Sequence, residues 1–327
     1  MTETTVPRRV FIVPYRDRIH HKFFFSRQMD FILEGQNDYE ILFVHQCDSR
    51  NFNRGAMKNI GFLAIKEKYP EQYKSITFIF NDIDTLPFNK MFDYETTIGV
   101  IKHYYGFETA LGGIVVIKGS DFELINGYPN YWGWGMEDAC LQKRCLFHRL
   151  QIDRSEFYPV GSPEILQLFD GVSRLVSRRD PQRMKTDNGQ DGLRTIHKLL
   201  FSIDKESLNP HDNEFSVDNN KFFYVNVTSF MTLVRFEVDS YHEYDLREPI
   251  SKIVFPDQQQ QYQQPQQQQP QQYQQPQQYQ QYQQQQSQQY KQQQHQQHMI
   301  SSNYTRVTSM KPRATKSANI DLGGVRR

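Results

Sequence analysis

Short apolar runs and longer amphipathic stretches alternate through the first half of the chain. Residues 21–33 and 53–70 predict helices, and in the second stretch the apolar residues recur at helical period and stop before a proline. A shorter helix is expected at residues 120–125. The expected buried strands are RVFIVP (9–14), YEILFVHQ (39–46), SITFIF (75–80) and GGIVVIK (112–118). Strands that alternate with helices in this way predict an α/β fold, with a mixed or mostly parallel sheet and helices on both faces.

The pattern changes after Ile165. Residues 170–192 are polar, basic and rich in turn formers, so they predict a long surface loop with one short helix. Residues 221–228 and 232–239 lie a few positions apart and show partial alternation of apolar and polar side chains. They predict a hairpin that closes the folded part of the chain.

Composition divides the chain into three parts. The mean hydropathy of −0.75 is low for a folded protein, but the deficit is concentrated at residues 258–298, which are almost entirely glutamine. Such a segment buries too little apolar surface to offset the entropy of ordering, although its Gln/Tyr mixture could self-associate. We therefore predict a folded domain at 1–255, a disordered low-complexity segment at 256–300 and a polar tail at 301–327.

Charge and cysteine content limit the partners and the compartment. The formal net charge of +1 gives no overall field that favours nucleic acid or an anionic membrane. Cys47, Cys140 and Cys145 form no paired framework, which fits a reducing compartment. No apolar run reaches the length of a signal or membrane helix. We expect a cytoplasmic protein with no membrane span.

Two aspartates follow the apolar strand expected at residues 75–80. Because side chains alternate along a strand, Asp82 and Asp84 can face one side while Ile83 turns to the core. Ligands often bind at the end of a buried strand of an α/β sheet, and two carboxylates there suit Mn²⁺ or Mg²⁺ with a bound diphosphate. Alternatively, both acids simply cap the turn in DTLP.

Basic and aromatic side chains lie beside two other expected strand and helix ends. Arg16 and Arg18 follow the first strand, where guanidinium groups fit phosphate oxygens or form a solvated basic loop. Phe52 and Arg54 precede the second helix, and Gly55 permits close approach of the backbone. The Phe52 ring could stack on a base or pack at the helix entrance.

Both tryptophans of the chain lie in the segment NYWGWGMED, residues 130–138. Glycines beside Trp132 and Trp134 leave the indole faces accessible for the C–H faces of a sugar. Glu137 and Asp138 begin a helical run, where a helix N-terminus favours carboxylates. An ionised carboxylate beside an aromatic platform suits a general base acting on a hydroxyl group. The alternative is a helix cap beside two core tryptophans.

Taken in order, the segments PYRDR, FNRGAMKNIGF, FNDIDTLP, GGIVVI, NGYPNYWGWGMED and DGL resemble the β-1,4-galactosyltransferase family, which includes xylosylprotein galactosyltransferases and N-acetylgalactosaminyltransferases. The resemblance extends from about Val10 to Val238, with a poor match after Ile165. It implies a GT-A fold, in which an α/β domain binds a nucleotide sugar and a metal ion holds the diphosphate of UDP.

The resemblance also implies roles for individual residues. By resemblance, Asp138 is the catalytic base, Glu137 helps to bind the acceptor, Asp84 ligates Mn²⁺ (or Mg²⁺) and Asp82 contacts the donor. The acceptor hydroxyl then attacks the anomeric carbon in line, which inverts its configuration. The other implied donor-site residues are Pro14, Tyr15, Arg16, Arg18, Phe52, Arg54, Trp134 and Gly135.

Three positions depart from the family pattern. The stretch at residues 166–183 lacks the histidine that completes the metal site in the family, and Asp170 is our substitute candidate. Ala139 replaces a second acid that helps to bind the acceptor. Ala110 replaces a tyrosine that restricts the donor to galactose, so UDP-GalNAc is as plausible a donor as UDP-Gal.

The leading hypothesis is an inverting transferase that moves a sugar from a UDP-sugar to a glycan or glycoside acceptor. Two other interpretations remain open. The missing histidine and Ala139 favour a catalytically inactive protein that binds a sugar nucleotide or glycan. A third reading makes the Gln/Tyr segment the working part and the folded domain its scaffold.

Overall fold

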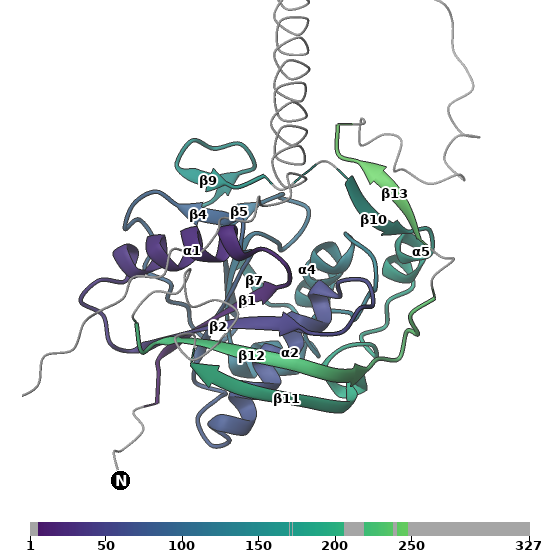
Figure 1. Cartoon of the computed structure of the whole chain (residues 1–327), viewed down its shortest axis with the longest axis horizontal. Helices are drawn as coiled ribbons and strands as arrows, with labels where there is room; N and C mark the ends of the chain where they lie inside the picture. Colours follow the sequence, from purple (N-terminus) through teal and green to yellow (C-terminus); the bar gives the residue numbers. More distant parts are fainter. Residues whose placement is uncertain (1–5, 170, 172, 206–218, 238–240, 248–327) are drawn as a thin grey trace, which may run out of the picture. The chain divides into compact units, whose positions relative to one another are not determined.

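A mixed β-sheet runs through the centre of the folded part (Figure 1). The computed structural model describes residues 6–169, 171, 173–205, 219–237 and 241–247. The chain divides into two units, Met1–Gln259 and Gln260–Arg327, and the second lies wholly outside the described residues. The predicted segments at 256–300 and 301–327 therefore lie there too.

The sheet contains nine strands in the order β11-β12-β2-β1-β3-β6-β5-β7, with β8 paired to β5. Neighbours are parallel from β12 to β3, and antiparallel where β11 meets β12 and where β6 meets β3 and β5. The strands are β1 (Arg9–Tyr15), β2 (Tyr39–Gln46), β3 (Thr77–Asn81), β5 (Val100–Gly106), β6 (Ile114–Lys118), β7 (Gln151–Asp153), β8 (Tyr158–Pro159), β11 (His197–Lys205) and β12 (Phe222–Met231). The mixed sheet confirms the expected α/β class.

Helices and short two-stranded sheets complete the described fold. One small sheet pairs β4 (Thr85–Pro87) with β9 (Ile165–Gln167), and another pairs β10 (Ser173–Ser177) with β13 (Tyr241–Asp245). The helices are α1 (Ile19–Ile32), α2 (Arg54–Lys68), α3 (Gly119–Leu124), α4 (Glu137–Phe147), α5 (Asp180–Lys185) and the 3₁₀ turn η1 (Leu193–Thr195). None of these helices is long and apolar enough to span a membrane.

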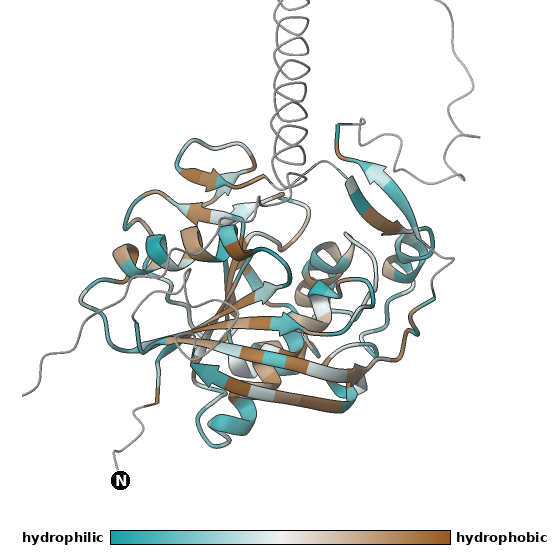
Figure 2. Ribbon diagram, viewed as in Figure 1, coloured by the Kyte–Doolittle hydropathy of each residue, from teal (hydrophilic) through white to brown (hydrophobic). Residues whose placement is uncertain are grey.

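Side chains of the central strands point alternately to the two faces of the sheet and pack into two cores, one on each face. On β1, Val10 and Ile12 pack with α2, whereas Phe11 and Val13 pack with α1. All four side chains are fully buried, and the central strands are correspondingly brown in the hydropathy view (Figure 2). The helices therefore cover both faces, as the sequence pattern predicts.

One predicted pairing is wrong. The expected hairpin between residues 221–228 and 232–239 does not form, because β12 continues to Met231 and its antiparallel partner is the earlier strand β11. Described residues after Met231 contribute no strand until β13, which pairs with β10. β11 lies at the edge of the sheet with alternate side chains exposed, so its apolar content is low. The strand was missed for that reason.

Local chemistry fixes the two helix starts that border the site. The Asn53 side chain accepts a hydrogen bond from the Ala56 amide at 2.9 Å and caps α2. A Cβ at Gly55 would lie 2.2 Å from the Pro129 carbonyl oxygen, so glycine brings α2 against that loop. Before α4, Met136 has a left-handed φ of 72°. These turns place the residues at the start of both helices opposite each other.

Candidate active site

A cavity of about 320 Å³ lies where β1 and β3 end and α2 and α4 begin. Asp82 and Asp84 follow β3 in a turn rather than lying on the strand, yet both face the cavity while Ile83 is buried with the α1-side core. A larger hollow of about 490 Å³ at the end of α1 contains none of the predicted site residues. The lining comprises Pro14, Arg16, Arg18, Asn51, Phe52, Arg54, Asp82, Ile83, Asp84, Trp132, Gly133, Trp134, Glu137, Ser173, Arg174 and Leu175.

Arg54 joins the carboxylates at the floor of this cavity. Its Nε donates to Glu137 Oε1 at 2.6 Å and its Nη1 to Asp82 Oδ2 at 3.0 Å. Its Nη2 donates to Asp138 Oδ2 at 2.5 Å. The resemblance implies that Arg54 is a donor-site residue, and its observed partners are acids of two segments, Asp82 after β3 and Glu137 and Asp138 on α4. The planar guanidinium fork is suited to such a three-way contact.

Lys58 is a member of the cluster that the sequence reasoning missed. Its Nζ lies 3.1 Å from Asp138 Oδ1 and 3.5 Å from Asp82 Oδ1, and its side chain is 1% exposed. It follows Arg54 by four positions on α2, and residues at that spacing share one helix face. That spacing is the signal that could have found it.

Burial and charge set the ionisation of the acids. Burial disfavours ionised Asp82, but the charges of Arg54 and Lys58 outweigh it and lower the pKa of Asp82. Burial raises the pKa of Glu137, and the opposing charge of Arg54 does not cancel that effect. Burial and the nearby charge of Asp82 raise the pKa of Asp84. The site therefore holds neighbouring carboxyl groups whose pKa values are displaced in opposite directions.

Two buried carboxylate oxygens of the cluster lack a hydrogen-bond partner. Asp82 Oδ1 has no hydrogen bond of standard geometry among the described residues, but the Lys58 ammonium group lies 3.5 Å from it as an ion pair. Glu137 Oε2 has no hydrogen-bond partner among those residues. An unsatisfied buried polar atom is costly, so a ligand hydroxyl that reached Glu137 Oε2 would be favoured.

Arginines surround the mouth of the cavity. Arg18 Nη1 lies 3.8 Å from Asp84 Oδ2. The Arg16 guanidinium lies 5.3 Å from the Phe52 ring centroid and donates to the Arg50 carbonyl oxygen at 2.5 Å. Arg174 of β10 also lines the cavity and was not among the predicted residues. Three guanidinium groups at one mouth suit an anionic ligand such as a diphosphate.

The two tryptophans have different surroundings. Trp132 is 1% exposed, stacks on Phe230 at 5.4 Å between centroids, and donates through Nε1 to the Val234 carbonyl oxygen at 2.7 Å. Trp134 is 37% exposed, and its backbone N–H donates to the Leu175 carbonyl oxygen at 2.7 Å. Trp132 is thus a core residue at the cavity wall, and Trp134 is the accessible indole.

Three predicted donor residues lie off the cavity lining. Tyr15 is 5% exposed and packs on the α1 side of the sheet. Gly135 lies in the turn before α4 with a φ of 93°. Ala110 lies in the loop before β6, where the next residue, Leu111, donates its N–H to the Asp138 carbonyl oxygen at 3.0 Å. Ala110 is therefore close in sequence to a contact with the proposed base.

The same loop confines Asp138. A Cβ at Gly112 would lie 2.5 Å from Asp138 Oδ2, so any side chain there would displace the carboxylate. Asp138 is 15% exposed, and Arg54 and Lys58 each contact one of its oxygens. Its orientation is set from three directions.

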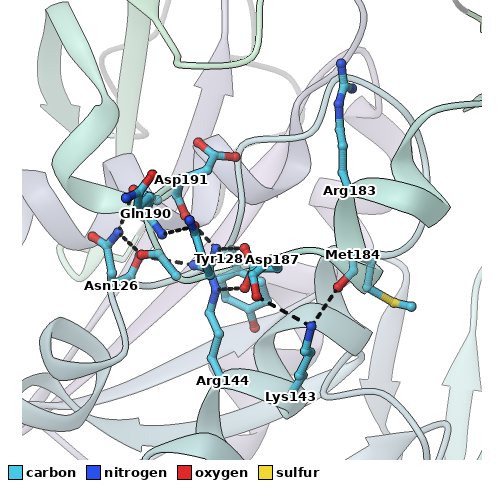
Figure 3. A network of polar contacts seen from close by, with 12 residues as sticks. Asn126, Tyr128, Lys143, Arg144, Arg183, Met184, Asp187, Gln190 and Asp191 are labelled. Carbon is cyan, nitrogen blue, oxygen red and sulfur yellow. Dashed lines mark hydrogen bonds and ion pairs between the residues drawn. The ribbon is translucent and has the colours of Figure 1, made fainter.

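An ion-pair network anchors the far end of α4 (Figure 3). Arg144 donates to both carboxylate oxygens of Asp187, at 2.9 and 2.7 Å, and to the Gly127 and Asp191 carbonyl oxygens at 2.7 and 2.6 Å. The Arg144 and Asp187 side chains are 4% and 6% exposed. This network holds α4 and the residues 187–191 together, and thereby supports the start of α4.

The residues present fit a hard divalent cation held in part by its substrate. Within the described ranges no group of three or more His, Cys, Asp or Glu side chains forms a preassembled metal site. Asp84 nevertheless offers a carboxylate to the cavity, and Asp170 lies outside the described residues. Mg²⁺-like ions commonly use one or two carboxylates with substrate phosphates, which suits this donor set.

Comparisons with known proteins agree with this arrangement. Residues 4–97 match the N-terminal region of glycosyl transferase group 7, and residues 94–165 match the N-terminal domain of galactosyltransferase. The chain is 30% identical over 224 residues to xylosylprotein 4-beta-galactosyltransferase of Caenorhabditis elegans. The aligned residues make up 63% of this chain and 75% of that protein. It is 31% identical over 154 residues to human beta-1,4-galactosyltransferase 1, covering 44% of this chain but only 38% of that protein.

Solved structures show the fold. The catalytic domain of Drosophila beta-1,4-galactosyltransferase 7 with xylobiose aligns with a TM-score of 0.50 and 21% identity, over 68% of this chain and 94% of that one. A mutant of that enzyme with manganese, UDP-Gal and xylobiose aligns with a TM-score of 0.54 and 20% identity over the same shares. The α/β fold of GT-A type is confirmed.

Proposed function

The chain belongs to the β-1,4-galactosyltransferase family of UDP-galactose-dependent hexosyltransferases, and from this premise we propose that it is an inverting, metal-dependent transferase. It moves galactose or N-acetylgalactosamine from a UDP-sugar to a hydroxyl group of a glycan or glycoside. Both solved structures of Drosophila beta-1,4-galactosyltransferase 7 contain xylobiose, and that of the mutant also contains manganese and UDP-Gal, so a xyloside is the first acceptor to test.

The cluster around Arg54 carries the proposal. Its guanidinium joins Asp82 and Glu137, which line the cavity, to Asp138, which lies next to them off the lining, and Glu137 Oε2 has no hydrogen-bond donor among the described residues. Sugar hydroxyls are such donors, while the arginines at the mouth suit the diphosphate. A cavity of about 320 Å³ is also in the range of small-ligand sites.

The chain's own residues account for the chemistry of transfer. Asp138 takes the proton of the acceptor hydroxyl, and that oxygen attacks the anomeric carbon as the bond to UDP breaks. Arg16 and Arg18 bind the diphosphate, and Trp134 packs against a sugar face. A divalent cation held by Asp84 would offset the charge of the leaving UDP. One displacement inverts the anomeric centre.

We expect the choice of donor sugar to depend on the small side chain at position 110, where the family has a tyrosine. Ala110 lies off the cavity lining, in the loop whose next residue, Leu111, contacts Asp138. We expect UDP-GalNAc to be turned over within about tenfold of UDP-Gal, because alanine excludes less volume than the tyrosine that restricts the donor in the family. A UDP-Gal preference of a hundredfold or more over UDP-GalNAc would contradict this expectation.

The test is UDP release from a panel of UDP-sugars with a xyloside acceptor, with Mn²⁺ or with a chelator. The proposal expects Mn²⁺-dependent release for UDP-Gal or UDP-GalNAc. UDP binding measured on the same samples separates the alternatives. Mn²⁺-dependent binding without turnover on any acceptor would favour a sugar-nucleotide-binding protein, and no binding would contradict both functions.

A further inference from the structure

A buried lysine contacts the proposed base without lining the cavity. Lys58 is 1% exposed, and its ammonium group lies 3.1 Å from Asp138 Oδ1. It lies 4.5 Å from the centroid of the Tyr128 ring, which is fully buried. Lysine is rarely buried unless it is paired, so the position demands an electrostatic partner.

The partner is the acid cluster. Asp82, Glu137 and Asp138 carry three negative charges when ionised, and Arg54 alone would leave two of them uncompensated. Lys58 supplies the second cation, at 3.1 Å from Asp138 and 3.5 Å from Asp82. The first distance is a hydrogen bond and the second is not, so the directed contact of Lys58 is to Asp138.

We propose that Lys58 is a positioning residue, whose ammonium group holds the Asp138 carboxylate in the orientation that faces the acceptor hydroxyl. The inference rests on the proposed function, because Asp138 is a base only if transfer occurs. Lys58 acts through Asp138 and has no place on the cavity lining.

The division of labour between the two cations supports this role. Arg54 borders the cavity, is 23% exposed and shares its donors among three carboxylates, so a bound ligand competes for it. Lys58 lies beneath the same carboxylates, shielded from solvent and packed against Tyr128. Its contact with Asp138 can persist while Arg54 engages a ligand.

Other charged and titratable groups around Asp138 are accounted for. Glu137 precedes it on α4, and Arg54 faces it from α2 at 2.5 Å. The charge of Asp138 also acts on the Tyr128 hydroxyl and on His103 of β5, whose imidazole pKa is lowered to about 4 by burial and by Arg154. With His103 neutral, Lys58 and Arg54 are the cations that contact Asp138 among the residues that the structure describes.

The test compares Lys58→Met with Lys58→Arg and with the matched control Lys22→Met. Lys22 is also a fully buried lysine on a helix, but it packs near Phe43 and Tyr224, on the α1 side of the sheet. For each variant the folded fraction, the UDP affinity with Mn²⁺ and the kcat are measured, with UDP-sugar and acceptor saturating.

For Lys58→Met we expect UDP affinity within about threefold of wild type and a fall in kcat of roughly 10- to 100-fold, the cost of a misplaced general base. Lys58→Arg keeps a cation beside Asp138 and recovers most of the kcat that Lys58→Met loses, and Lys22→Met leaves kcat unchanged.

The outcomes distinguish a failure of the Lys58 proposal from a failure of the proposed transferase function. A folded Lys58→Met variant with unchanged kcat, or an equal loss of kcat in a folded Lys58→Arg variant, overturns the positioning role while the transferase stands. A wild-type protein that turns over no donor overturns the proposed function itself. If Lys58→Met does not fold, Lys58→Gln takes its place, with the same expected results.

Discussion

At the scale of single residues, Arg54 is the point on which the site depends. Among the described residues, its side chain alone contacts all three of Asp82, Glu137 and Asp138, through a different nitrogen for each at 2.5 to 3.0 Å. Burial works against its charge, yet the three carboxylates raise its pKa. The Arg54 guanidinium therefore stabilises the buried carboxylates of the fold and also contacts the proposed base.

Replacing Arg54 should lower the stability of the protein, by an amount that depends on the ionisation of the carboxylates. For Arg54→Met we expect a loss of about 3–5 kcal/mol in the free energy of unfolding at pH 7, because buried carboxylates lose their partner. The deficit should shrink as pH falls toward 5, because protonation removes the uncompensated charges. Chemical denaturation at both pH values measures it.

The matched control is Arg8→Met. Arg8 pairs with Glu95 at 2.8 Å, but its side chain is 68% exposed, so its loss should cost less than about 1 kcal/mol at either pH. Equal losses of unfolding free energy for Arg8→Met and Arg54→Met would show that the buried ion-pair cluster contributes no more to stability than an exposed ion pair.

The two tryptophans make a second prediction at this scale. Trp132→Ala should cost about 3–5 kcal/mol of unfolding free energy, because it empties a core position. Trp134→Ala should leave stability near wild type and raise the KM for a sugar substrate roughly fivefold, for a lost contact of about 1 kcal/mol. Thermal unfolding and steady-state kinetics distinguish them, and the reverse pattern would refute the assignment.

The types and the order of residues in the sequence indicated which side chains form the site. They did not indicate which of these side chains contact one another. The sequence indicated the acids at 82, 84, 137 and 138, and all four lie at one cavity or its floor. The partner of Arg54 and the presence of Lys58 depend on how α2 meets α4 across the sheet, which no local pattern contains. Trp132 and Trp134 are two residues apart, and only packing separates their roles.

At the scale of elements, the loop between β5 and β6 is held by a neutral histidine. His103 Nε2 lies 3.0 Å from the Gly112 carbonyl oxygen, while its Nδ1 accepts from Arg154 Nε at 3.0 Å. The arginine donor requires an unprotonated Nδ1, so Nε2–H donates to Gly112. This contact steadies the loop that packs against Asp138.

That arrangement predicts a pH dependence of stability. Burial first, and then the charge of Arg154, lower the imidazole pKa from 6.5 to about 4. A lowered folded pKa favours the neutral form, so its stabilisation is complete above about pH 6.5 and is lost as pH falls toward 4. Relative to His103→Gln, which keeps a donor and an acceptor, wild type should lose about 3 kcal/mol over that interval.

Denaturation of both proteins at several pH values measures this difference. A constant difference between wild type and His103→Gln from pH 7 to 4 would mean that His103 does not titrate with folding.

Elements with continuous apolar runs were predictable, and edge elements were not. β1, β2, β3 and β6 are buried on both faces, so their sequences carry the signal directly. β11 and β12 pair across a gap in sequence, and a local reading paired β12 with its neighbour at 232–239 instead. Strand pairing is a tertiary property that a segment's own composition cannot contain.

At the scale of the whole molecule, the predicted site residues that the structure describes lie within residues 14–138. A chain that ends after residue 255 keeps them all, together with every described strand and helix. We expect it to retain turnover within about threefold of the full chain, since every predicted site residue that the structure describes remains in it. Loss of turnover in a folded truncated protein would make the Gln/Tyr segment part of the function.

The central claim is that Asp138 is the base of a UDP-sugar transferase, and one comparison tests it most directly. UDP release with donor, acceptor and Mn²⁺ is measured for wild type, Asp138→Asn and the control Asp153→Asn on β7, which does not line the cavity. Our account predicts that Asp138→Asn binds UDP normally but loses about 10²- to 10⁴-fold in kcat, while Asp153→Asn stays near wild type. Undiminished turnover in a folded Asp138→Asn protein would contradict it.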